Sequence, residues 1–202
     1  MARPRAVLWD VGNVIVRWDP RTLYSKIFPD VAERDAFLRD VCTGEWNLRH
    51  DAGLPMADGI AERTALFPHH AEAIAAWQSR WWEMFSGPIP ETETAINDLA
   101  ARGVPQFGLT NMSHETCDGT FAMSPVFGHL ADIVVSGHHR ITKPDPAIYH
   151  LACERAGLAP SDFVFVDDSR RNIEGAAALG FHVHRFVDPA ALRPALEGFG
   201  LL

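Results

Sequence analysis

Short runs of consecutive apolar residues are the main feature of the hydrophobic pattern of this chain. Five such runs stand out, at Ala6–Trp9, Pro105–Leu109, Ile133–Val135, Phe163–Val166 and Phe181–Phe186. Most of them do not alternate between apolar and polar residues, as expected of strands that are buried on both faces. The pattern therefore predicts five short strands of a buried parallel sheet.

Helical patterns separate the later strands. They predict helices at Thr92–Arg102, Pro146–Ala156 and Arg171–Leu179. Gly103 and Gly180 follow the first and the third as helix-ending glycines. Asp145 precedes the second, where it can cap the helix beside a proline at its first position. Alternating strands and helices predict an α/β fold, a Rossmann-like parallel sheet with right-handed connections and helices on both faces.

The segment between the first two predicted strands has a different character. From about Asp19 to Ser86 we find several helical stretches and no convincing strand. The segment includes or borders five of the six tryptophans, which are Trp18, Trp46, Trp77, Trp81 and Trp82. The run from Gly87 to Pro90 is typical of a linker. We therefore predict a core domain at residues 1–16 and 88–202, and an inserted α-helical cap at residues 17–87.

Composition narrows the classes of partner. The formal charge is 18 − 26 = −8, which disfavours nucleic acid and anionic membrane surfaces. The three cysteines, Cys42, Cys117 and Cys153, form no CxxC pair and are expected to be free thiols. We see no signal peptide and no apolar run long enough to span a bilayer. These features favour a cytoplasmic protein, as a monomer or a homodimer, with a small-molecule substrate.

Polar residues follow three of the predicted strands. Asp10 comes after the first, Thr110 and Asn111 after the second, and Asp167 and Asp168 after the fourth. In an open α/β sheet, ligands bind beyond the carboxyl ends of the strands. We therefore expect these three clusters to converge on one crevice.

This set of side chains suits phosphoryl transfer. A carboxylate such as Asp10 can attack phosphorus and form an aspartyl-phosphate. A divalent cation must neutralise the repulsion between carboxylate and phosphate, and carboxylates are ligands that Mg²⁺ accepts. Lys143, which precedes the Pro146 helix, and Thr110 can contact the remaining phosphoryl oxygens.

Four motifs in order resemble those of the haloacid dehalogenase (HAD) superfamily of hydrolases, in the branch with a helical cap after the first strand. They are Asp10–Val14, Thr110–Asn111, Lys143–Pro146 and Val166–Ala176. The last is the most specific of the four. Together they span nearly the whole chain, and their order and spacing make the resemblance strong.

The resemblance implies a magnesium site. Asp10 would be both nucleophile and metal ligand, and the backbone carbonyl of Gly12 would be a second ligand. Asp168 would bind the ion directly. Asp167 would contact the ion through a water molecule, or would hold the side chains that bind it.

The resemblance also implies roles around the phosphoryl group. Asp10 would attack the phosphorus. Thr110 would bind the phosphoryl group with help from the amide of Asn111. Lys143 would neutralise charge between Asp10 and the phosphate.

Gly12 departs from the pattern of the family's phosphatases. They usually have a second aspartate there, which protonates the leaving group and then activates water. The Asp-x-Gly-Asn-Val form is similar to members related to α-glucose-1-phosphate phosphatases. A metal-bound water, or His50 or Asp51 from the cap, can replace the missing aspartate. Alternatively, a good leaving group would need less help.

The cap segment from Glu45 to Gly53 contains the candidate substrate-contacting residues. We expect Trp46 and His50 to face the active site and to bind the substrate. The alternative for Trp46 is packing between cap helices, as is usual for a tryptophan.

The predicted function is a Mg²⁺-dependent phosphatase for a small phosphate monoester, such as a sugar phosphate. A 2-haloacid dehalogenase of the same superfamily is one alternative. It would use Asp10 without a metal, and that branch typically lacks an acidic pair like Asp167-Asp168. A pseudo-phosphatase without activity is the other alternative, because of Gly12.

Overall fold

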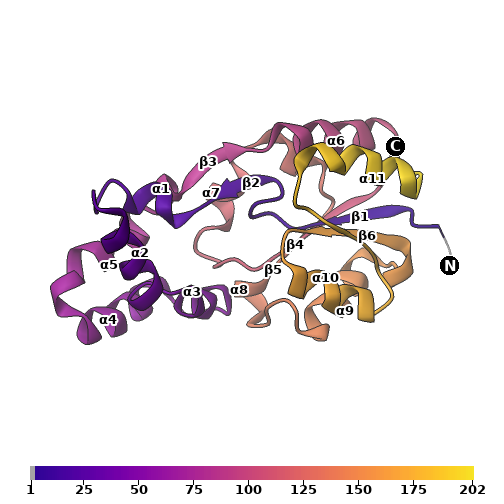
Figure 1. Ribbon diagram of the computed structural model, residues 1–202. Helices are drawn as coiled ribbons and strands as arrows, with labels where there is room; N and C mark the ends of the chain where they lie inside the picture. Colours follow the sequence, from indigo (N-terminus) through magenta and orange to yellow (C-terminus); the bar gives the residue numbers. More distant parts are fainter. Residues whose placement is uncertain (1–2) are drawn as a thin grey trace.

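A five-stranded parallel sheet forms the centre of the computed structural model, which describes residues 3–202 (Figure 1). Its spatial order is β5-β4-β1-β6-β7, with the strands at Ala6–Trp9 (β1), Gln106–Thr110 (β4), Ile133–Val135 (β5), Phe163–Asp167 (β6) and His182–Arg185 (β7). All four neighbouring pairs are parallel. The α/β prediction is confirmed, and each predicted strand agrees with an observed one to within one residue at either end.

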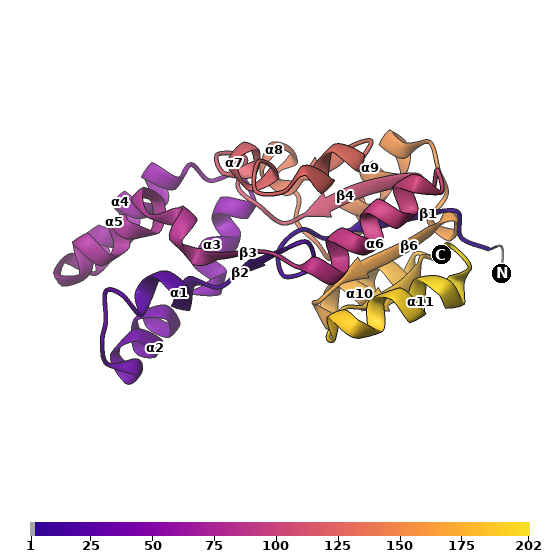
Figure 2. The ribbon, with the colours of Figure 1, turned by 90° about the horizontal axis from the view of Figure 1, so that it is seen from above.

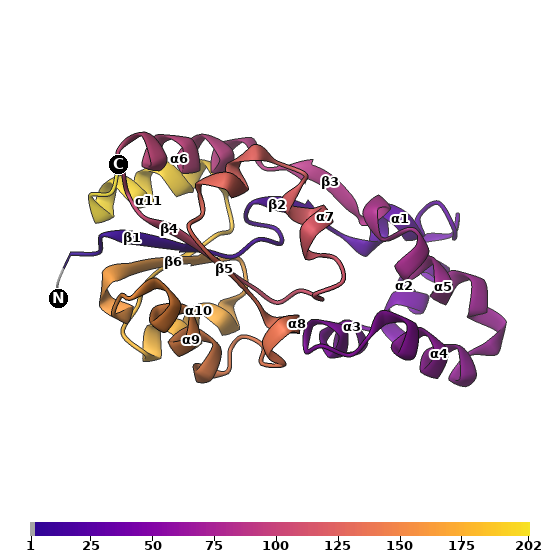
Figure 3. The ribbon, with the colours of Figure 1, turned by 180° about the vertical axis from the view of Figure 1, so that it is seen from behind.

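Two pairs of helices cover the two faces of the sheet (Figures 1 and 3). On one face lie α6 (Pro90–Ala101) and α11 (Leu192–Phe199), and on the other lie α9 (Pro146–Ala156) and α10 (Arg170–Ala178). The sequence pattern predicted three of these helices and missed α11. Within residues 3–202, no helix combines the length and apolarity that crossing a bilayer requires.

The first strand shows why the sheet is buried on both faces. Val7 and Trp9 join the hydrophobic cluster under α6 and α11. Ala6 and Leu8 join the cluster under α9 and α10. Successive side chains of a strand point to opposite faces, so a continuous apolar run supplies both cores.

Short helices occupy several connections of the sheet domain. They are α7 (Cys117–Phe121), α8 (Ser136–His139) and the 3₁₀ helices η3 (Pro125–His129), η4 (Pro160–Asp162) and η5 (Pro189–Ala191).

The predicted cap of α9 is present, because the Asp145 carboxylate accepts a hydrogen bond from the amide of Ala147 at 2.9 Å.

The helical segment lies beyond the carboxyl ends of the strands, at the opposite end of the molecule from the two termini (Figures 1 and 2). It comprises α1 (Pro20–Tyr24), α2 (Val31–Asp40), α3 (Gly44–Asp51), α4 (Met56–Leu66), α5 (Ala71–Ser79), η1 (Pro68–His70) and η2 (Trp81–Met84). These helices share a hydrophobic cluster of their own, which includes Tyr24, Trp46 and Trp77. The segment therefore has a core separate from those of the sheet.

A two-stranded ribbon joins the helical segment to the sheet domain. The sequence analysis did not predict this ribbon. Strand β2 (Val16–Trp18) pairs antiparallel with β3 (Phe85–Pro88). The expected linker from Gly87 to Pro90 is thus partly strand and partly the start of α6. The chain passes between the two parts twice, and the two segments form backbone hydrogen bonds with each other. A four-residue pattern such as Phe-Ser-Gly-Pro does not reveal this pairing, because it depends on a tertiary contact.

Replacing Gly59 by alanine is expected to destabilise the helical segment by up to about 2 kcal/mol. A Cβ on Gly59 would lie 2.2 Å from Cε1 of the buried His50 ring. Overpacking costs about 1–3 kcal/mol, and a contact this short with a buried ring lies toward the upper end, above the ~1 kcal/mol that alanine gains over glycine in a helix. Gly198 of α11 has open space around its Cβ position and serves as the control. Urea unfolding checks the pair; a Gly59→Ala protein as stable as Gly198→Ala would contradict the packing described here.

Candidate active site

Three adjacent strands bring the predicted acidic residues together. Asp10 follows β1, Thr110 ends β4, and Asp167 ends β6, with Asp168 next in the chain. Because β4, β1 and β6 are neighbours in the parallel sheet, these ends lie at one edge. One carboxylate oxygen from each of Asp10, Asp167 and Asp168 lies within 4.8 Å of the others.

Lys143 lies among these acidic groups. Its Nζ is 2.8 Å from Oδ1 of Asp10 and 2.7 Å from Oδ2 of Asp167. It also donates to the carbonyl of Leu109 at 2.9 Å. Its side chain is almost completely buried, so the three acceptors use the full donor capacity of the ammonium group.

The side chain of Asn111 holds the loop that carries Lys143. Its Oδ1 accepts from the backbone amide of Lys143 at 2.8 Å, and its Nδ2 donates to the backbone carbonyl of the same residue at 3.1 Å. This paired contact fixes Lys143 against the end of β4. The Asn111 side chain is thereby a positioning group for the lysine.

The two members of the acidic pair have different surroundings. Asp167 is fully buried, and its carboxylate accepts from Lys143, from the amide of Ser169 at 2.8 Å and from Nδ2 of Asn172 at 3.1 Å. Asp168 is only partly buried. Its carboxylate is the more accessible of the two, while Asp167 mainly orients the lysine.

Burial and like charges shift the titration of this cluster. Burial raises the pKa of Asp10 to about 8, with Lys143 opposing the shift and Asp167 adding to it. Burial also raises the pKa of Asp168, and the neighbouring Asp167 carboxylate adds to the shift. Burial alone would lower the pKa of Lys143, but Asp10 and Asp167 outweigh it and raise this pKa. The lysine therefore stays charged, and the site holds more carboxylates than it has cations.

The donor set fits a hard divalent cation. Three converging carboxylates with a single lysine carry excess negative charge, which a bound cation would offset. Oxygen donors of this kind suit Mg²⁺ or Ca²⁺ better than the softer transition metals. Asp10 and Asp168 are the residues whose carboxylates we expect to hold such an ion.

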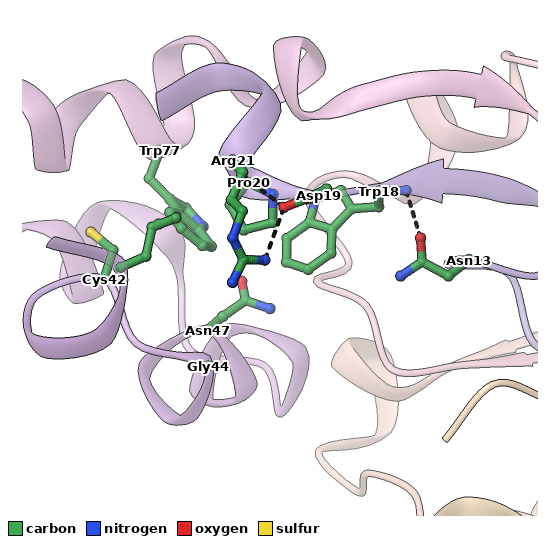
Figure 4. Close-up of a pocket in the computed structure, with 10 residues that line it drawn as sticks. Asn13, Trp18, Asp19, Pro20, Arg21, Cys42, Gly44, Asn47 and Trp77 are labelled. Atoms are coloured by element: carbon green, nitrogen blue, oxygen red, sulfur yellow. Dashed lines mark hydrogen bonds and ion pairs between the residues drawn. The ribbon is translucent and has the colours of Figure 1, made fainter. Parts of the chain in front are cut away.

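Two cavities lie near the junction of the sheet domain and the helical segment, and the larger is lined by residues of the segment 18–77 and, from the sheet domain, by Asn13. The smaller, of about 90 Å³, is lined by Gly12, Thr110 and Asn111 from the sheet side and by Asp51 among others from the helical side. The larger, of about 470 Å³, is drawn in Figure 4. Trp18 and Asn47 line both cavities, so a molecule that reaches the strand ends can also extend into the larger space.

Within the described residues 3–202, three buried polar atoms on residues that line the larger cavity have no hydrogen-bond partner. They are Nε1 of Trp18, Nε1 of Trp77 and Oδ1 of Asn47, from three different elements (Figure 4). Unpartnered buried polar groups are costly, and they are accounted for when a ligand or water binds them. Residues that line the larger cavity therefore carry two donors and one acceptor without a protein partner.

Trp46 and His50 do not face these cavities, contrary to the sequence expectation. The Trp46 ring is 1% exposed, packs against Trp77 and donates from Nε1 to the carbonyl of Gly59 at 3.2 Å. His50 is fully buried, and its Nδ1 lies 3.1 Å from the carbonyl of Leu54. The alternative of packing between the cap helices holds for Trp46.

Asn47 and Asp51, one residue further along α3 from each of those two, line the smaller cavity instead. Residues four apart share a face of a helix, so Trp46 and His50 occupy one face and Asn47 and Asp51 the next. The sequence analysis expected Trp46 and His50 to bind the substrate and named Asp51 as a candidate proton donor, and the structure brings Asn47 and Asp51 to the smaller cavity. If Trp46 packs in the interior, the helical spacing places Asn47 and Asp51 on the neighbouring face, toward the site.

Comparisons with known proteins identify the family of this chain. The chain matches the haloacid dehalogenase-like hydrolase family over residues 4–180. It is 28% identical over 204 residues to acyl-CoA dehydrogenase family member 10 of Mus musculus, a match that covers 96% of this chain and 19% of that protein. It is 30% identical over 96 residues to (S)-2-haloacid dehalogenase 1 of Pseudomonas sp. (strain CBS-3), covering 48% of this chain and 42% of the relative. The chain spans less than half the length of either relative.

A solved structure shares the fold. The HAD family enzyme bt-2542 of Bacteroides thetaiotaomicron, in complex with magnesium and inorganic phosphate, superimposes with a TM-score of 0.67 at 20% identity. The match covers 94% of this chain and 98% of that one. On the family match over most of its length, and on this fold, the chain belongs to the haloacid dehalogenase-like hydrolases.

Proposed function

We propose that this hydrolase is a Mg²⁺-dependent phosphatase that cleaves a small phosphate monoester through an aspartyl-phosphate on Asp10. The single observation that carries the proposal is the convergence of Asp10, Asp167 and Asp168 within 4.8 Å. Displacement of a halide at carbon needs one carboxylate and no metal. Three carboxylates at one point are costly unless a cation is bound beside them.

Each residue of the site would have a separate role in the reaction. The Asp10 carboxylate attacks phosphorus, and Lys143, 2.8 Å away, holds it in place and balances its charge. The hydroxyl of Thr110 and the amide of Asn111 bind phosphoryl oxygens at the end of β4. Mg²⁺ held by Asp10, Asp168 and the carbonyl of Gly12 would neutralise the charge of the phosphoryl group.

The helical segment at residues 17–87 would act as a cap over this site. It contributes Trp18, Asn47 and Asp51 to the cavity walls, and movement of such a segment would admit the substrate and then exclude bulk water. Its cavities suit a small metabolite better than a protein. Family analogy favours a sugar phosphate, and the unpartnered donors and acceptor around the larger cavity suit the hydroxyl groups of such a leaving group.

A 2-haloacid dehalogenase is the competing function, because a relative of that activity matches nearly half of the chain. The two functions respond oppositely to metal removal. With p-nitrophenyl phosphate as substrate, we expect turnover that requires Mg²⁺ and that falls to background in EDTA. With 2-chloropropionate, we expect no halide release in either condition. Halide release that is unaffected by EDTA, with no phosphate release, would establish the dehalogenase instead.

A further inference from the structure

Gly12 leaves the proposed reaction without an obvious proton donor. An alcohol leaving group must be protonated as its bond to phosphorus breaks, and water must later lose a proton. A Cβ on Gly12 would have no atom within 4 Å, so the backbone there borders open space. The missing group must reach this space from another element.

Asp51 is a carboxylate that borders the same space. It is the last residue of α3, only 8% exposed, and it lines the smaller cavity with Gly12 and Thr110. The sheet domain and the helical segment therefore meet at a cavity with Gly12 on one wall and a buried carboxylate on another.

The position of Asp51 is energetically unfavourable for a purely structural residue. A negative charge at the C-terminal end of a helix opposes the helix dipole. Among residues 3–202, Asp51 makes no ion pair, and its carboxylate accepts from Nδ2 of Asn47 at 3.1 Å and from the amide of Ser113. Burial raises the pKa of Asp51 to about 7, against the opposing effects of Ser113 and of Lys143. Both the acid and its conjugate base are therefore accessible near neutral pH.

The end of α3 is fixed to the sheet domain. Oγ of Ser136 donates to the carbonyl of Asp51 at 2.5 Å, and the Glu115 carboxylate accepts from the amide of Met56 at 2.9 Å. Helices α3 and α8 lie side by side in both side views (Figures 1 and 3). These contacts hold the end of α3 against the sheet domain beside the cavity.

We propose that Asp51 is the general acid and base of this site, supplied from the helical segment in place of a side chain at position 12. The proposal rests on the phosphatase function given above. As Asp10 forms its bond to phosphorus, the bond from phosphorus to the ester oxygen breaks, and the Asp51 carboxyl group gives its proton to that oxygen. Water then attacks the phosphorus of the aspartyl-phosphate, the Asp51 carboxylate takes the proton of that water, and Asp10 and inorganic phosphate are released.

In an Asp51→Asn protein, two substrates with different leaving groups distinguish the loss of the proton donor from the loss of the base. With p-nitrophenyl phosphate the first step needs little protonation, so we expect a burst of nitrophenol near one equivalent per enzyme. The steady-state rate that follows should be about 10²-fold or more below that of the wild type, because no base activates the water. With glycerol 3-phosphate we expect a similar loss without a burst. Rapid-quench kinetics with Mg²⁺ measures both.

Two further variants complete the test. Gly12→Asp places a carboxylate on the opposite wall of the cavity, and in the Asp51→Asn background it should restore steady-state turnover. Glu45→Gln, at an exposed position of the same helix, should leave all rates unchanged. Equal losses on both substrates, without a burst and without rescue, would assign Asp51 a structural role and overturn the inference. A failure of the phosphatase proposal itself would be seen without any Asp51 variant, as a wild-type protein that releases no phosphate or as turnover that persists in EDTA and in Asp10→Asn, and would overturn both.

Discussion

Asp10→Asn is expected to lower Mg²⁺-dependent phosphatase turnover by roughly 10⁴- to 10⁶-fold, the scale of losses seen when an enzyme's nucleophile is removed. The amide cannot form the acyl phosphate, although it has almost the same size as the carboxylate. The fold should survive, because Lys143 keeps its contact with Asp167 at 2.7 Å. Turnover of p-nitrophenyl phosphate, together with circular dichroism of the purified variant, measures both expectations.

Asp58→Asn provides the matched control for this experiment. Asp58 lies at an exposed position of α4, away from the strand ends. Its replacement should leave turnover within about twofold of the wild type, since surface changes alter stability by less than about 0.5 kcal/mol. An Asp10→Asn protein that retains a tenth of the wild-type rate would remove Asp10 from the mechanism.

Lys143→Met is expected to have the second large effect, on stability as well as on turnover. It removes the single ammonium group that contacts the buried carboxylates of Asp10 and Asp167. Leaving buried charges uncompensated costs about 3–5 kcal/mol. Because a bound cation would compensate in part, urea unfolding should be measured in EDTA, and added Mg²⁺ should recover some of the loss. Turnover should fall by about 10²- to 10³-fold, as when a group that stabilises transition-state charge is removed.

The other lysine of the chain offers the comparison. Lys26 pairs with Glu83 at 2.8 Å, but its side chain is 52% exposed. Such pairs contribute about 0–1 kcal/mol, so Lys26→Met should change neither stability nor turnover by much. Similar unfolding midpoints for Lys143→Met and Lys26→Met would contradict the charge balance described for the site.

The sheet and its crevice followed from the sequence because both depend on local patterns. Continuous apolar runs such as Ala6–Trp9 indicate strands buried on both faces, and polar residues after such runs must lie at one edge of a parallel sheet. The proximity of Asp10 to Asp167, separated by most of the chain, was predicted on this basis. The geometry now shows it directly.

The helical segment was less predictable, for two physical reasons. The face of α3 that meets the site depends on which residues pack against α4 and α5. The sequence pattern favours Trp46 and His50 at the active site, with interior packing as the alternative for Trp46, and the structure buries both side chains. The ribbon of β2 and β3 forms because two chain crossings lie side by side, not because either strand has a strong pattern. Both depend on tertiary contacts that a single sequence does not display.

Direct mapping of the phosphoryl group tests the central claim most closely. The protein would be mixed with Mg²⁺ and a phosphate ester, quenched in acid within milliseconds, digested with pepsin and analysed by mass spectrometry. We predict the added mass of one phosphoryl group on the peptide that contains Asp10, and its absence in EDTA and in Asp10→Asn. Steady hydrolysis with the label on another residue, or with no label at any quench time, would contradict the account.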